Sequence, residues 1–203
     1  MYRKTDTLYK KIRKRLVSVN DLAGKKSGYK LKRVTYSRPA TLAALEKFGS
    51  KEIRAIEIGC AAGNNSLDVL SKLNIKEYTI IDPYELLDNS YDDYTKERLI
   101  LMRNQAKRKL YKYQNSINWI YKTSKEAIAD LSGKYDFIYI DGDHSFEYAY
   151  DDMTSFFPFL SSNYVFGGHD IDQPGVSKAF CKFLREQDVQ KVYFKDPDWI
   201  VSS

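Results

Sequence analysis

Short apolar runs alternate along most of this chain with longer stretches in which apolar residues recur every three or four positions. Runs of the first kind predict buried strands, and stretches of the second kind predict helices packed against them. The predicted strands span 54–59, 77–82, 117–122, 137–141, 164–166, 189–194 and 199–201. The predicted helices span 39–48, 65–73, 92–112, 125–131, 145–157 and 176–185. This alternation is typical of an α/β fold with a largely parallel sheet.

The last two strands differ from the others in their connection. Only Lys195-Asp196-Pro197-Asp198 separates them, a turn-forming stretch too short for the crossover that parallel strands need. We therefore expect an antiparallel hairpin at the end of the sheet. A length of 203 residues fits one domain better than two, because a single core can fill it.

Charge is distributed unevenly along the chain, whose formal net charge is +6. Residues 1–33 carry twelve lysines and arginines against two acids, a local charge of +10, which leaves −4 on the other 170 residues. Such a basic arm can contact nucleic acid, an anionic membrane surface or an acidic substrate. Leu8, Ile12 and Leu16 recur every four residues, so we favour a simpler interpretation: residues 1–36 include an amphipathic helix that is part of the same domain as 37–203.

Two classes of protein are disfavoured by composition. No run of 18 apolar residues is present, and the first residues are basic, so a soluble cytoplasmic protein without membrane insertion is expected. Cys60 and Cys181 form neither a disulfide framework nor zinc-ligand spacing, which predicts two free thiols.

A loop of small residues follows the first predicted strand and reads Glu57-Ile-Gly59-Cys-Ala-Ala-Gly63-Asn-Asn-Ser66. Small residues let a backbone approach a ligand, and the next helix offers free N–H groups at its start. The spacing is not the G-x-G-x-x-G of nicotinamide and flavin sites, and an acid two residues before Gly59 suits a cation better than a pyrophosphate. Asp82, at the end of the second strand, suits the hydroxyls of a ribose. We therefore expect a nucleoside with a positively charged tail.

The only two histidines lie in similar tetrapeptides, Asp141-Gly-Asp-His144 and Gly167-Gly-His169-Asp170, each after a predicted strand. Ligands of open α/β sheets bind beyond the carboxyl ends of the strands, so both tetrapeptides are expected at one site. An imidazole, with an ordinary pKa of ~6.5, suits proton transfer, and carboxylates suit hard cations.

The glycine loop and Asp82 together resemble the class I S-adenosylmethionine-dependent methyltransferases, over residues from about 37 to the end. The resemblance implies a Rossmann-like sheet with strand order 3-2-1-4-5-7-6 and helices on both faces. It implies that the loop holds the methionine part of S-adenosylmethionine above Glu57, that Asp82 takes the ribose, and that Thr123 and Ser124 flank the adenine. The implied cofactor-binding residues are Glu57, Gly59, Cys60, Ala61, Gly63, Ser66, Asp82, Pro83, Thr123, Ser124 and Asp141.

Within this class, Asp141-Gly-Asp-His144 resembles the strand-four element of cation-dependent O-methyltransferases that act on catechols and caffeoyl esters, and of sugar and macrocin O-methyltransferases. The resemblance implies Asp141 as a ligand of Mg²⁺ or another divalent cation and His144 as the base. A second metal element follows strand five in those proteins, where this chain has His169-Asp170-Ile171-Asp172. Asp170 would then be a ligand, with His169 or Asp172 as a third. Without a metal, His144 or His169 would act as general base.

These patterns predict an enzyme that transfers a methyl group from S-adenosylmethionine to a hydroxyl of a small molecule, such as a sugar or a phenol. The residues expected to take part in catalysis are Asp141, His144 and His169. Two alternatives stay open. One is a methyltransferase of RNA or another polyanion that binds through residues 1–33, and the other is a partner subunit that binds the cofactor without catalysis.

Other features are left open by the sequence. The protein can be a monomer or a homo-oligomer. The acceptor is expected to be selected by residues 1–40 and 84–95, whose pattern predicts least. Asp143 and Ser145 are each suited to cap the following helix, which is a structural alternative to a role in the site.

Overall fold

Seven strands form one sheet in the computed structural model, which describes residues 37–85 and 95–203. Their order is β3-β2-β1-β4-β5-β7-β6; β1 to β5 run parallel, and β7 pairs antiparallel with both β5 and β6. The strands are β1 (Ile53–Ile58), β2 (Ile75–Ile81), β3 (Ile117–Ile120), β4 (Tyr135–Ile140), β5 (Leu160–Gly168), β6 (Lys191–Lys195) and β7 (Asp198–Ser202). The predicted fold class, strand order and terminal hairpin are confirmed.

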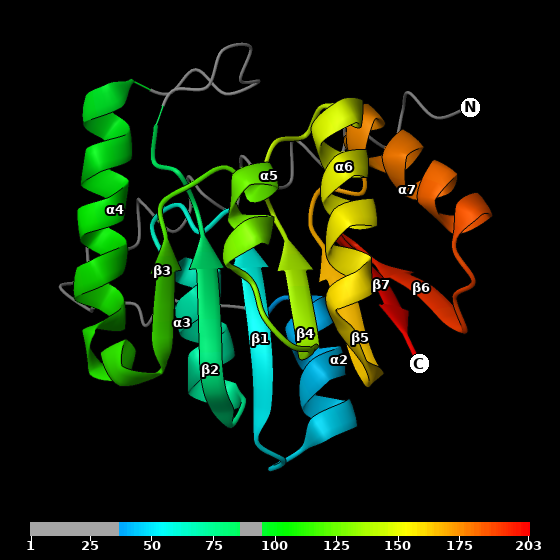
Figure 1. Cartoon of the computed structure of the whole chain (residues 1–203), viewed down its shortest axis with the longest axis horizontal. Helices are drawn as coiled ribbons and strands as arrows, with labels where there is room; N and C mark the ends of the chain where they lie inside the picture. Colours follow the sequence, from blue (N-terminus) through cyan, green and yellow to red (C-terminus); the bar gives the residue numbers. More distant parts are fainter. Residues whose placement is uncertain (1–36, 86–94) are drawn as a thin grey trace, which may run out of the picture. The chain divides into compact units, whose positions relative to one another are not determined.

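Helices cover both faces of the sheet (Figure 1). One apolar cluster joins the sheet to α5, α6 and α7, and a second joins its other face to α2, α3 and α4. The helices are α2 (Pro39–Phe48), α3 (Asn64–Lys72), α4 (Lys96–Leu110), α5 (Ser124–Ala127), α6 (Phe146–Phe156) and α7 (Pro174–Glu186). Within the described residues no helix is long and apolar enough to cross a membrane.

Alternation along β1 decides which side chains face which cluster. Ile53 and Ala55 belong to the cluster under α3, whereas Ile56 and Ile58 belong to the cluster under α6. Successive residues of a strand point to opposite faces, so Glu57 shares the face of Ala55. An acid is thereby placed inside the protein, beneath the start of α3.

Strand β5 is longer than the predicted 164–166, because it begins at Leu160 and continues through Gly167 and Gly168. A Cβ on Gly168 would lie 2.4 Å from the indole ring of Trp199, and one on Gly167 would lie 2.7 Å from Cβ of Ala40. The strand therefore needs glycine, which has no Cβ, where β7 and α2 pack closely on it. Two adjacent glycines indicate a strand end by local propensity, and tertiary packing overrides that indication.

Some helix starts also differ from the predictions. The predicted helix 92–112 is described from Lys96, and the Thr95 side chain accepts a hydrogen bond from the Arg98 N–H at 3.3 Å. Residues 1–36 and the start of that predicted helix lie outside the described residues. At α6, Ser145 occupies the capping position without a side-chain bond, and the Asp143 carboxylate instead accepts the Ser145 N–H at 2.8 Å.

Candidate functional site

The loop after β1 is held in place by Asp82, which follows β2. One oxygen of the Asp82 carboxylate accepts the backbone N–H groups of Cys60 and Ala61, each at 2.9 Å, and the other accepts the N–H of Tyr84 at 2.9 Å. The Tyr84 hydroxyl returns to the loop and donates to the carbonyl of Ala61 at 2.8 Å. Burial raises the pKa of Asp82, and the three N–H donors oppose that rise. Asp82 therefore positions the loop, besides any part in binding a ribose.

Both loop glycines are required by the protein's own backbone. Gly59 has φ +83°, and a Cβ there would lie 1.9 Å from the carbonyl oxygen of Asp141 at the end of β4. Gly63 has φ +71° at the start of α3, and its Cβ would lie 3.1 Å from Ala106 in α4. The sequence predicts glycines here for close approach to a ligand. The structure shows that each is already needed for approach to a neighbouring element.

Glu57 is fully buried beneath this loop and is bonded on every side. Its carboxylate accepts from Asn65 Nδ2 at 2.9 Å, from the Tyr78 hydroxyl at 3.1 Å and from the Ser66 hydroxyl. Burial raises the pKa of Glu57 to about 7, against the effect of these hydrogen bonds, and the charge of Asp141 adds to the rise. The carboxyl is therefore poised to lose its proton when a positive charge comes close.

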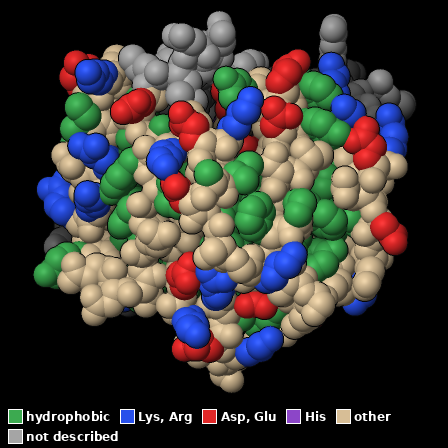
Figure 2. All heavy atoms as spheres, in the orientation of Figure 1, with side chains coloured by type: hydrophobic (Ala, Val, Ile, Leu, Met, Phe, Trp, Pro, Cys, Tyr) green, Lys and Arg blue, Asp and Glu red, His purple; other side chains and the backbone are tan. Residues whose placement is uncertain are grey.

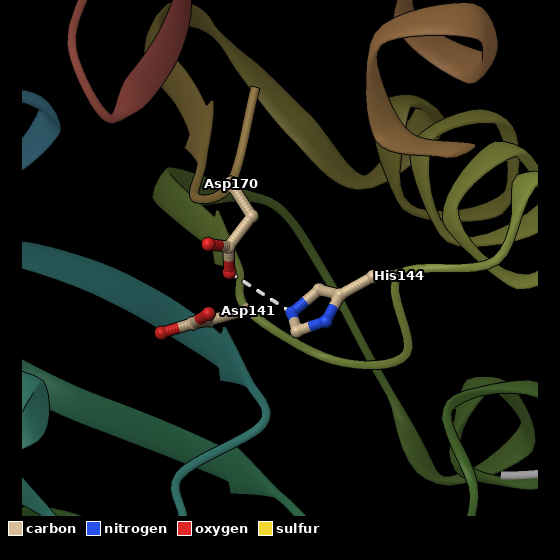
Figure 3. Close-up of side chains that lie close together, drawn as sticks. All are labelled: Asp141, His144 and Asp170. Carbon is tan, nitrogen blue, oxygen red and sulfur yellow. Dashed lines mark ion pairs between the residues drawn. The ribbon is translucent and has the colours of Figure 1, made fainter. Parts of the chain in front are cut away.

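The two histidine tetrapeptides meet at one place, as predicted (Figure 3). His144 Nε2 lies 2.9 Å from Oδ2 of Asp170, and His169 Nδ1 lies 2.7 Å from the same oxygen. His169 Nδ1 is also 3.6 Å from Oδ1 of Asp141. Asp141 and His144 come from the loop after β4, and Asp170 from the loop after β5, where its φ of +57° is one that Asp tolerates better than most residues.

The two carboxylates of this cluster are shifted in opposite directions. Burial raises the pKa of Asp141 to about 6, with Asp170 adding to the rise and His169, Arg38 and His144 opposing it. Burial would also raise the pKa of Asp170, but its hydrogen bonds to the two histidines outweigh burial and lower it well below the ordinary range. Asp170 is thus ionised, while Asp141 carries a charge that the protein neutralises only partly.

Three ligand atoms of Asp141, His144 and Asp170 lie within 4.8 Å of one another, a separation at which they could hold one metal ion. The predicted set had His169 or Asp172 as the third ligand. His169 contacts both carboxylates without belonging to the compact group, and Asp172 is exposed. Sequence order alone could not distinguish the two histidines, because their distances depend on how the two loops turn.

A single cavity of about 550 Å³ connects the loop after β1 with the histidine cluster. Three predicted site residues do not line it: Gly63 shapes the turn, Ser66 bonds Glu57 from below, and Asp172 is exposed. The predicted residues that line the cavity are Glu57, Gly59, Cys60, Ala61, Asp82, Pro83, Thr123, Ser124, Asp141, His144, His169 and Asp170.

Several lining residues were not predicted individually, although Arg38 and Tyr84 lie in the segments 1–40 and 84–95 that were expected to select the acceptor. Arg38 lies with Nη2 3.8 Å from Oδ2 of Asp141, and Tyr84 braces the glycine loop. Asp152, in the middle of α6, also lines the cavity. A signal for Asp152 was present, because it occupies the same helical face as the buried Ala149 and Phe156, where a charged residue is unusual. Arg38 has no comparable signal.

Comparison with known proteins agrees with this geometry. A family model described as a methyltransferase domain matches residues 56–171, more than half of the chain. The matched region begins in β1 and ends one residue after Asp170, so it contains the glycine loop and the Asp141, His144 and Asp170 cluster. The chain belongs to this methyltransferase family.

Solved structures share the fold at low sequence identity. A protein from Corynebacterium glutamicum is 17% identical, with 80% of this chain and 77% of that chain covered and a TM-score of 0.60. A Streptococcus mutans protein assigned as a methyltransferase, in complex with SAH, is 15% identical, with 82% and 97% covered and a TM-score of 0.58. An rRNA methylase from Streptococcus thermophilus is 10% identical, with 83% and 96% covered and a TM-score of 0.56. No curated protein matches the chain.

Proposed function

We propose that this protein transfers the methyl group of S-adenosylmethionine to a hydroxyl of a small molecule, assisted by a divalent cation. The observation that carries the proposal is the continuous cavity, which has the glycine loop at one part and the Asp141, His144 and Asp170 cluster at another. Methyl transfer requires the two reactants to be aligned within one partly dry pocket. A single cavity lined by both groups of residues meets that requirement.

The residues around the loop fit S-adenosylmethionine, which supplies a methyl group on a positively charged sulfur. Glu57 provides a buried carboxyl whose pKa of about 7 would fall beside a positive charge. Asp82 already accepts three N–H groups, yet a carboxylate has about four acceptor sites, so a ribose hydroxyl can still bond to it. The SAH complex of the S. mutans protein, which shares the fold, is consistent with this assignment.

The histidine cluster fits a divalent cation. Asp141, His144 and Asp170 offer two carboxylate oxygens and one imidazole nitrogen, a donor set that suits Mn²⁺ better than Mg²⁺, because Mg²⁺ takes oxygen ligands. Burial raises the pKa of Asp141, and the charge of Asp170 adds to the rise, so a cation beside Asp141 would stabilise its ionised form. A cation held there would lower the pKa of a bound substrate hydroxyl. His169, 2.7 Å from Asp170, would orient that carboxylate.

The test is a transfer assay with S-adenosylmethionine labelled on its methyl group. A host extract is separated into small-molecule, RNA and protein fractions, and each is incubated with Mg²⁺, with Mn²⁺ or with a chelator. Label in small molecules that depends on the cation supports the proposal. Small-molecule label that persists with chelator removes the cation from the mechanism and leaves His144 to accept the proton itself. Binding of SAH without transfer to any fraction would instead indicate a non-catalytic subunit.

RNA is a second candidate acceptor, favoured by the surface of α4. From Lys96 to Lys112 the chain carries seven basic side chains against one acid, and Figure 2 shows Lys and Arg side chains over this helix. Arg103 and Lys107 lie 5.9 and 5.1 Å from the ring centre of the exposed Tyr121, a combination that suits stacked bases and phosphates. The shared fold of the S. thermophilus rRNA methylase agrees with this alternative.

The RNA candidate makes its own prediction. Label would enter the RNA fraction regardless of chelator, and binding to single-stranded RNA would weaken steeply with salt. If α4 contacts phosphates, the double variant Arg103→Ala/Lys107→Ala would reduce the slope of log K against log[salt] by about two. Unchanged RNA binding in that variant would exclude α4 as the RNA surface.

A further inference from the structure

Asp152 of α6 is a buried acid that the mechanism above does not use. Asp152 is only 4% exposed, yet it lines the cavity. The rest of the inward face of α6 is apolar, with Ala149, Met153 and Phe156 in the core. A charged residue at such a position is costly unless it is paired, so its presence needs a compensating contact.

The contacts of Asp152 within the protein are few. Its carboxylate is hydrogen bonded to the side chain of Ser124, and a Cβ built on Gly142 would lie 3.4 Å from its Oδ2. Within residues 37–85 and 95–203, no lysine, arginine or histidine forms an ion pair with it, and Asp143 and Asp151 are negative neighbours. Burial raises the pKa of Asp152 to about 7, which agrees with the lack of a cationic partner.

The position of Asp152 indicates which part of a ligand it would meet. It lines the cavity together with Thr123 and Ser124, which follow β3, and with Gly142, which follows β4. If S-adenosylmethionine binds as proposed, with its ribose near Asp82 and its adenine flanked by Thr123 and Ser124 as the resemblance implies, the base lies at the loop after β3. The edge of the base would then face α6, which contacts α5, the helix that follows β3 in the chain.

We propose that the Asp152 carboxylate accepts a hydrogen bond from the exocyclic amino group of the adenine ring, with Ser124 holding the carboxylate in position, and thereby selects an adenine nucleoside. This inference rests on the proposed function, because it assumes a nucleoside in the cavity. An ionised carboxylate is only an acceptor, and the amino group of adenine is a donor. A base with a carbonyl oxygen at that position would place two acceptors against each other.

The experiment measures the affinity for two ligands that differ only at this group. SAH carries the amino group, and S-inosylhomocysteine carries an oxygen in its place. Both are titrated calorimetrically at pH 8.5, where Asp152 is ionised, into the wild-type protein, Asp152→Asn and the matched control Asp151→Asn. Asp151 is the adjacent, exposed residue of the same helix, so its substitution removes the same charge without touching the cavity.

The wild-type protein is expected to bind SAH about tenfold to a hundredfold more tightly than S-inosylhomocysteine. Asp152→Asn should reduce this preference at least tenfold, because an amide can turn its NH₂ group toward the oxygen. Asp151→Asn should keep the wild-type preference.

Three outcomes would overturn the inference. A wild-type preference below about threefold would do so whether or not the variant folds. An Asp152→Asn variant that weakens both ligands equally would show that Asp152 only supports the packing of α6 against Ser124. A wild-type protein that binds neither ligand would refute the proposed function itself, and the inference with it.

Discussion

The two halves of the cavity are built on opposite electrostatic principles. In the half formed by the loop after β1, the carboxylates of Glu57 and Asp82 accept hydrogen bonds from hydroxyl, amide and backbone N–H groups. In the half after β4 and β5, His169 contacts the carboxylates of both Asp141 and Asp170, and His144 contacts Asp170. In the first half the protein's own donors fill most of the hydrogen-bonding capacity of the carboxylates. In the second half the carboxylates of Asp141 and Asp170 can still bind a cation or a proton.

The largest effect is expected from Gly59→Ala, which disrupts the loop after β1. The new Cβ would lie 1.9 Å from the Asp141 carbonyl oxygen, and the alanine would have to adopt a φ of +83°. We expect a loss of about 3 kcal/mol or more in the free energy of unfolding, measured with urea, and loss of SAH binding.

The control for this variant is Gly49→Ala, which also has a positive φ of +57° but has no atom within 4 Å of the new Cβ. The difference between the two variants isolates the close approach to β4 from the cost of the backbone conformation. Equal losses would mean that Gly59 is needed only for its dihedral angles.

A smaller effect is expected from Asp170→Asn, which alters the other half. Loss of the carboxylate that holds His144 at 2.9 Å and His169 at 2.7 Å should lower the transfer rate by about a hundredfold. The affinity for SAH should change less than threefold, because the substitution leaves the loop after β1, Glu57 and Asp82 unchanged. Asp172→Asn, which changes an exposed acid two residues further on, should leave both quantities unchanged. A large fall in SAH affinity in Asp170→Asn would show that the two halves are not separate.

The smallest effect concerns the pH dependence of stability that Glu57 causes. Its pKa is about 7 in the folded protein, against an ordinary value of 4.5 that applies to the unfolded chain. Between these two pH values the folded protein keeps a proton that the unfolded chain has lost. Stability therefore falls as the pH rises from 4.5 to 7, on the order of 1 to 3 kcal/mol for this residue, and levels off above pH 7. Glu57→Gln should flatten the fall between pH 5 and pH 8 in urea unfolding, whereas the exposed Glu52→Gln should not. Equal slopes for all three proteins would contradict the buried, protonated Glu57.

Much of the fold followed from local patterns. Alternating apolar runs predicted every strand, and the short Lys195–Asp198 connection predicted the antiparallel hairpin. Strand ends were predicted less well, because Gly167 and Gly168 continue β5 only where Trp199 packs against them. Gly168 and Trp199 are 31 residues apart in the sequence, and no local pattern contains their contact.

The candidate site was predicted in part for the same reason. Residues next to strand ends, such as Asp82 and Asp141, could be placed together because parallel strands share an edge. Arg38 and Asp152 were missed, since Arg38 directly precedes α2 and Asp152 lies in α6, and the positions of these helices depend on the packing of both apolar clusters.

By itself the sequence determined the order of strands and helices and the residue types at the edge of the sheet, because periodicity and spacing are properties of the chain. Only the tertiary structure decided that Gly59 must accommodate the β4 backbone, that His144 rather than His169 completes the compact group, and that Asp152 lines the cavity. Those facts depend on distances between separate elements, which side-chain packing sets to within an ångström.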